Sequence, residues 1–136
     1  MTSILTNALQ YHDDGEKSLG PNIAAWSLGC PAMMNVRMKF KYYSGFSKDR
    51  KKYRTDLPIL SGCFKPEVRR ELNLMRGLTE KALTKKAKEL LKGVPSSPPA
   101  ILKMKLRHGD FMSMHGADMQ LYYEVCSSVI CYNKCP

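Results

Sequence analysis

The stretch "MMNVRMKFK" (residues 33–41) decides the fold, because apolar and polar side chains alternate along it. One set is apolar: Met34, Val36, Met38 and Phe40. The other is polar or basic: Asn35, Arg37, Lys39 and Lys41. A period of two is typical of a strand with one buried face and one solvated face. The stretch therefore predicts a sheet whose outer face is basic.

The segments on either side of this alternation also predict strands. "NIAAWSL" (22–28) is mostly apolar and favours a buried strand, and "GCPA" (29–32) favours a turn into the next strand. "ILKMKLR" (101–107) again alternates apolar and basic residues. "HGD" (108–110) then predicts a hairpin turn, from which "FMSM" (111–114) leads away.

The middle of the chain has a different character. Residues 42–61 are polar, basic and interrupted by glycine, which favours a long loop. The next segment, at about 62–93, has apolar residues at helical spacing, with Thr79 as an N-cap and Gly93 near a stop. Strands, a helical insert and further strands predict a mainly β fold, with an antiparallel jelly roll, or double-stranded β-helix, as the best match.

Length and charge narrow the class of protein. The 136 residues suit one domain, and a net charge of +10 favours polyanionic partners, either nucleic acid or an anionic membrane surface. A basic surface that only keeps the protein in solution explains the charge equally well. No apolar run approaches the ~20 residues of a membrane span, and no signal-peptide pattern is present. We therefore expect no membrane partner, an intracellular location in nucleus or cytoplasm, and five free thiols.

A pair of possible metal ligands lies near the start, in His12-Asp13-Asp14. Residues at i and i+2 of a strand point to the same side, so His12 and Asp14 could bind one ion. An imidazole and a carboxylate suit ferrous iron in a site of two histidines and one carboxylate. A solvated polar loop is the alternative, because a His-x-Asp pair often arises by chance.

Two longer blocks decide between these alternatives. The first, "YHDDGEKSLGPNIAAWSLGCPAMMNVRMK" (11–39), contains His12, Asp14, Glu16, Ser18-Leu19-Gly20-Pro21, Ile23-Ala24 and Ser27-Leu28-Gly29. The second is "LRHGDFMSMHGADMQLYYE" (106–124). Together they resemble the oxygenase core of the AlkB-like Fe(II)/2-oxoglutarate-dependent dioxygenases, particularly a fungal-type group.

The resemblance implies a site and an activity. His12 and Asp14 would be the first two iron ligands, with Fe(II) as cofactor and 2-oxoglutarate as co-substrate. The family's chemistry is oxidative dealkylation of nucleic-acid bases, as in DNA or RNA repair. A carbon of the N-alkyl group is hydroxylated, and the adduct releases an aldehyde. A protein substrate on the same scaffold is a further possibility.

The chain departs from the family pattern after Glu124. The family places a histidine there, whereas this chain has Val125, which cannot bind iron. No arginine follows Arg107, although the family has one that pairs with 2-oxoglutarate. We therefore expect an incomplete domain over 1–125, impaired activity, and a divergent cysteine-rich tail over 126–136.

Two other histidines could replace the missing ligand. His108 resembles a turn residue of the family, and His115 precedes a glycine near a strand end. The three tail thiols, spaced C-x4-C-x3-C, match no zinc pattern and are interpreted as incidental.

A basic segment, "RMKFKYYSGFSKDRKKYR" (37–54), is the candidate nucleic-acid surface. Its basic residues are Arg37, Lys39, Lys41, Lys48, Arg50, Lys51, Lys52 and Arg54, and its rings are Tyr42, Tyr43, Phe46 and Tyr53. Cations for phosphates and rings for stacking predict binding of single-stranded or alkylated nucleic acid. A solvated loop whose rings pack on the core is the structural alternative. A non-catalytic nucleic-acid-binding module, with the helices of 66–92 included, is the functional alternative.

Overall fold

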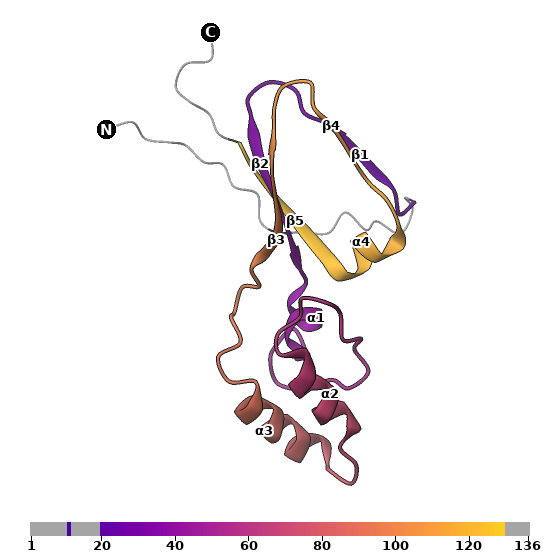
Figure 1. Cartoon of the computed structure of the whole chain (residues 1–136), viewed down its shortest axis with the longest axis vertical. Coiled ribbons are helices and arrows are strands. Elements are labelled where there is room, and N and C mark those ends of the chain that lie inside the picture. The colour runs from indigo at the N-terminus through magenta and orange to yellow at the C-terminus, as the bar shows by residue number, and fades with distance from the viewer. Residues whose placement is uncertain (1–10, 12–19, 130–136) are drawn as a thin grey trace, which may run out of the picture. The chain divides into compact units, whose positions relative to one another are not determined.

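The sheets and most of the helices occupy separate parts of the chain. The computed structural model describes residue 11 and residues 20–129 (Figure 1). The chain divides into two units, which are described one at a time. The strand unit comprises the described residues up to Arg37 together with those from Ala100 onward. The helical unit comprises residues 38–99.

The strand unit is built on antiparallel pairing between segments far apart in the sequence. β1 (Ile23–Trp26) pairs with β4 (Phe111–Met114), and β2 (Ala32–Met38) pairs with β3 (Ala100–Leu106). Facing residues include Ile23 with Met114, Trp26 with Phe111 and Ala32 with Leu106. The two antiparallel pairings follow one another along the same two segments. Residues 23–37 and 100–114 therefore form one long ribbon that bends between its two sheets (Figure 1).

Hydrogen bonds continue through the bend. Ser27 N donates to Asp110 O at 2.8 Å, and Gly109 N donates to Ser27 O at 2.7 Å. Gly29 N donates to His108 Nδ1 at 2.8 Å. Both Gly29 and Gly109 have positive φ, +93° and +88°, a conformation that glycine adopts without steric cost. Both segments of the ribbon therefore bend at the same place, each at a glycine.

This pairing corrects one prediction. The sequence "HGD" predicted a hairpin turn between 101–107 and 111–114, and that prediction is wrong. The two segments pair with β2 and β1 instead of with each other. Local sequence could not reveal this, because a glycine with positive φ serves a bend in a ribbon as well as a hairpin.

β5 (Tyr123–Val129) completes the larger sheet, whose order is β3-β2-β5. α4 (Ala117–Tyr122) leads from β4 into it. The alternation along β2 is confirmed, because Met34, Val36 and Met38 are 7%, 2% and 1% exposed. Met34 and Val36 pack with Val125, and further residues join them: Met104, Leu106, Met112, Met114, Met119 and Tyr123.

The fold class is confirmed at a coarse level. The described residues combine helices with antiparallel sheets, and they form no closed barrel. Within the same residues, no helix is both long and apolar enough to cross a membrane.

The helical unit holds α1 (Phe40–Ser44), α2 (Pro66–Leu74) and α3 (Glu80–Leu90). α2 begins with Pro66, whose fixed φ suits the first helical turn. Thr79 is the predicted N-cap of α3, and its Oγ1 accepts a hydrogen bond from Ala82 N at 3.2 Å. The core of this unit consists of Phe46, Tyr53, Leu72, Ala87 and Leu91.

The segment predicted to be a long loop, 42–61, supplies much of this core. Phe46 and Tyr53 form an antiparallel bridge, and their rings meet edge-on with centroids 5.6 Å apart. Tyr42 and Tyr43 are also buried, at 6% and 9% exposure. The prediction of a long loop is confirmed for residues 45–61, which hold no helix or strand beyond the Phe46–Tyr53 bridge. Within this loop, a tight turn carries the rings of Phe46 and Tyr53 inward.

A buried guanidinium lies at the centre of the helical unit. Arg69 is fully buried; its Nη1 donates to Tyr42 O at 2.8 Å and its Nη2 to Pro58 O at 3.5 Å. Gly45 ends α1 with φ +83°, and a Cβ there would lie 2.8 Å from both Arg69 Nε and Tyr53 Cε2. Arg69 therefore joins α1 to the loop at Pro58, and a side chain larger than glycine at position 45 would displace Arg69 or Tyr53.

We predict that Arg69→Ala lowers the free energy of unfolding by about 2–4 kcal/mol, because it leaves a cavity and two carbonyl groups without their donor. Urea unfolding of the full chain, followed by circular dichroism, measures the change. Arg70 is the matched control, since it is the exposed neighbour on the same helix. A loss for Arg69→Ala no larger than the loss for Arg70→Ala would contradict the role of the buried guanidinium.

A pair of glycines separates backbone strain from crowding. Gly45 and Gly62 have nearly the same φ, +83° and +85°, but a Cβ at Gly62 meets nothing within 4 Å. Gly62→Ala should lower the free energy of unfolding by about 1 kcal/mol, because alanine is strained in a left-handed backbone conformation. Gly45→Ala should lower the free energy of unfolding by about 1–3 kcal/mol more than Gly62→Ala does, because Arg69 or Tyr53 must move. Equal shifts in the urea midpoint would rule out the close contact at Gly45.

Candidate functional site

The structure describes only some of the candidate iron ligands. His12 and Asp14 lie outside the described residues. His108 accepts a hydrogen bond from Gly29 N, and His115 Nε2 lies 2.7 Å from Ser113 Oγ. Among the residues that the structure describes, no three His, Cys, Asp or Glu side chains gather where they could hold a metal ion. Neither histidine therefore belongs to such a group there.

Arg37 joins the two segments that border the predicted iron site. Its Cζ lies 3.6 Å from the centroid of the Tyr11 ring, and its Nε donates to Glu124 Oε1 at 2.6 Å. The side chains of the ion pair are only 17% and 19% exposed, so water screens the pair less than a surface pair. Tyr11 directly precedes His12, and Glu124 directly precedes Val125.

Val125 faces the interior of the strand unit. It is 9% exposed and packs against Met34 and Val36. Beside it lies a hollow of about 240 Å³ to which all five strands contribute. Residues that line it include Ile23, Met34, Leu106, Met112, Val125 and Ser127. This largely apolar lining does not fit a ferrous ion, which requires imidazole and carboxylate ligands.

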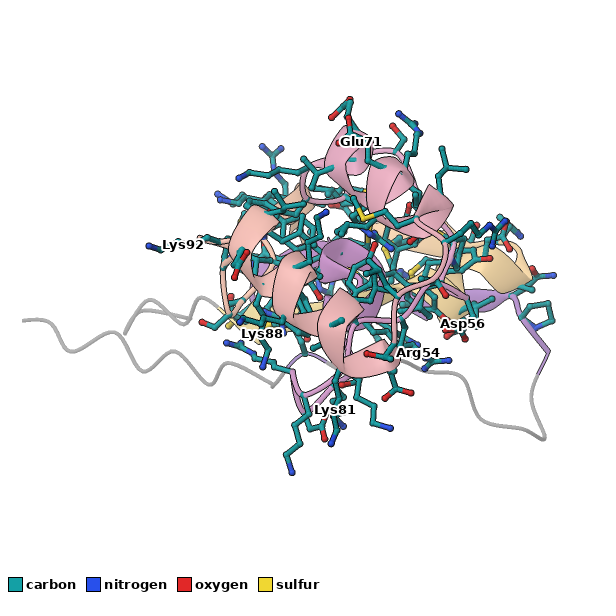
Figure 2. All side chains as sticks on the ribbon, turned by 90° about the horizontal axis from the view of Figure 1, so that it is seen from below. Arg54, Asp56, Glu71, Lys81, Lys88 and Lys92 are labelled. Atoms are coloured by element: carbon teal, nitrogen blue, oxygen red, sulfur yellow. The ribbon has the colours of Figure 1, made fainter. Side chains whose placement is uncertain are left out.

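The eight candidate nucleic-acid-binding residues do not form one set. Arg37 belongs to the strand unit, whereas the other seven belong to the helical unit. Three of those seven form ion pairs on the surface, and Lys51 does so with Asp49. Lys52 Nζ lies 2.9 Å from Glu80 Oε1, and this hydrogen bond raises the pKa of Lys52. Arg54 pairs with Asp56, and Figure 2 shows the two side chains close together.

The remaining four differ in their surroundings. The Arg50 Cζ lies 4.6 Å from the centroid of the Phe40 ring, and its Nη2 donates to Ser96 O at 3.1 Å. Lys39 and Lys41 are half-buried, and Lys41 lies beside the Tyr42 ring, whereas Lys48 is exposed.

The rings predicted to stack on bases are not accessible. Tyr42, Tyr43, Phe46 and Tyr53 are each at most 9% exposed. Burial raises the pKa of both Tyr43 and Tyr53. Their predicted stacking role is wrong, and the alternative that the rings pack on the core is confirmed.

A second group of basic residues was missed by the sequence prediction of individual sites. Lys81, Lys85 and Lys88 of α3 line a hollow together with Lys51 and Lys52, which belong to the turn at 47–52. The signal was present in the sequence, because positions i, i+4 and i+7 lie on one face of a helix.

Comparison with known proteins gives no relative for this chain, since no protein-family model, curated protein or solved structure matches it.

Proposed function

We propose that this chain carries an AlkB-like Fe(II)/2-oxoglutarate-dependent dioxygenase domain that acts on nucleic-acid bases. In this proposal the ribbon and β5 are strands of a double-stranded β-helix. The pairing of the two resembling blocks supports it: the first block supplies β1 and β2, and the second supplies β4 and the end of β3. A nucleic-acid substrate would give the protein a location in nucleus or cytoplasm.

The contacts of Arg37 carry the proposal. In the family pattern, the first iron ligand is His12, and the last follows the Tyr-x-Glu step at position 125. Arg37 contacts the ring of Tyr11 and pairs with Glu124, so one side chain holds the residues that precede both positions. Segments more than a hundred residues apart in sequence thus come together where the proposal needs them.

The iron ligands that the proposal assigns to this chain are His12 and Asp14. The described residues do not complete the site, because Val125 offers no lone pair and its neighbours in the hollow are largely apolar. The arginine that would pair with 2-oxoglutarate is also missing, since the last arginine is Arg107. We derive no catalytic step, and we expect turnover to be impaired.

A second candidate function is nucleic-acid binding without redox chemistry. The lysines of α3 and the turn at 47–52 favour it, because they gather in one hollow of the helical unit. The two candidates differ in their dependence on His12. The His12→Ala substitution abolishes any Fe(II)-dependent reaction but leaves simple polyanion binding unchanged.

We predict that Val125→His raises the affinity of the chain for Fe(II) by about tenfold or more, because it supplies the third ligand of a facial triad. Anaerobic calorimetric titration with Fe(II) measures the affinity, and circular dichroism verifies that the variant folds. The gain must disappear in the double variant with His12→Ala.

Ser127→His is the matched control for this gain. Ser127 lies two residues further along β5 and borders the same hollow, so a histidine there is near the site without occupying the family position. Equal gains for the two variants, or a gain that survives His12→Ala, would contradict the proposed ligand set. No gain in a folded Val125→His variant would contradict it as well.

A further inference from the structure

The helical unit contains a hollow with basic walls. Its volume is about 480 Å³, and its lining comes from α3 and from the turn at 47–52. The residues are Lys51, Lys52, Glu80, Lys81, Thr84, Lys85 and Lys88. The lining thus contains five lysines and one glutamate, and all of them belong to the helical unit. We call this hollow the lysine groove.

The turn is fixed beside α3 by specific contacts. Tyr53 N donates to Thr84 Oγ1 at 3.2 Å, and Thr84 is 8% exposed. Lys52 N donates to Ser47 Oγ at 3.1 Å, and Lys51 N donates to Asp49 Oδ1 at 3.2 Å. Hydrogen bonds from Ser47 and from the Lys51 backbone lower the pKa of Asp49.

Most of the positive charge in the groove is not neutralised. Within the described part of the helical unit, the ion pairs are Lys51–Asp49, Lys52–Glu80 and Arg54–Asp56. None of them involves Lys81, Lys85 or Lys88. In Figure 2, Lys81 and Lys88 project from α3, and Glu71 of α2 points to the opposite side of the view. Uncompensated cations close together favour a ligand with several negative charges.

A second hollow adjoins the lysine groove and shares Lys88 with it. Its volume is about 270 Å³. Phe40, Phe46, Leu91 and Val94 give it apolar walls, and Arg50, Lys88 and Lys92 are its cations. We call it the apolar pocket. A ligand that fills both hollows must combine negative charges with an apolar group.

We propose that the lysine groove binds the phosphodiester backbone of single-stranded nucleic acid and that a base of the same strand enters the apolar pocket. Lys81 to Lys88 spans about 10 Å along α3, because each helical residue rises 1.5 Å. That length suits two or three successive phosphates of an extended strand. The site shares Arg50, Lys51 and Lys52 with the 37–54 surface, but most of its remaining cations come from α3. It rests on the proposed function for its class of ligand.

A membrane surface fits these observations less well. The lysines line a concave surface, whereas a bilayer presents a flat layer of phosphates. A duplex also fits less well, because its bases are stacked and cannot enter a pocket. Neither Fe(II) nor 2-oxoglutarate takes part in binding, so failure of this proposal is distinguishable from failure of the oxygenase proposal.

The test is fluorescence anisotropy of the full-length chain with a short labelled oligothymidine, over a range of salt concentrations. The variant Lys81→Gln/Lys85→Gln/Lys88→Gln should bind at least about tenfold more weakly at low salt. Its plot of log affinity against log salt should flatten by about 2, since three contacts contribute about 0.7 each. An abasic oligomer of equal length should bind the unmodified chain about fivefold or more weakly, because base contacts are lost.

The matched control is Arg70→Gln/Arg76→Gln/Lys86→Gln, which removes the same charge from exposed positions outside the groove. It should change the affinity less than about threefold. Equal losses in the two triple variants would overturn the proposal in favour of net charge alone. Loss of binding to phosphatidylserine vesicles but not to oligothymidine would overturn it in favour of a membrane. Equal binding of the abasic oligomer would overturn the assignment of a base to the apolar pocket.

Discussion

The structure depends on one constraint, the antiparallel register of the long ribbon. Arg37 faces Ala100 where β2 and β3 begin to pair, so the ends of the segment 38–99 are held together. Closing a long flexible loop costs little more than closing a shorter one, because the cost grows only with the logarithm of length. A whole helical unit can therefore be inserted at this point while the register on either side of the bend is maintained.

Arg69 lies at the centre of the helical unit, where its guanidinium is fully buried. A buried guanidinium is costly unless its donors are satisfied. Carbonyls of Tyr42 and Pro58 accept from Nη1 and Nη2 of Arg69, whereas its buried Nε has no hydrogen-bond partner among the described residues. Gly45 and Tyr53 close over the same group. This packing fixes the turn at 47–52, and the lysine groove exists because that turn is held against α3. The proposed binding surface is thus a consequence of the core.

Local patterns predicted most of the strands and the two longer helices but not α1 or α4, whereas long-range packing determined which strands pair. The alternation of Met34, Val36 and Met38 predicted β2, and Thr79 predicted the start of α3 correctly. The partner of residues 101–107 was not predictable from local sequence, since it depends on a pairing across some seventy positions. The rings of Phe46 and Tyr53 were misassigned to a surface because they pack on Leu72, Ala87 and Leu91, which come much later in the sequence. His12 and Asp14 stay predictions, because they lie outside the described residues.

The most direct test is to measure by nuclear magnetic resonance which strands lie side by side. The proposed oxygenase domain requires its two blocks to pair, so the backbone protons of Ala25 and Met112 should show a nuclear Overhauser contact, as should those of Ala24 and Ser113. A local hairpin around "HGD" would instead give backbone contacts between Lys105 and Ser113. The first result would support one continuous ribbon. The second would separate the two blocks and remove the structural support for the proposed function.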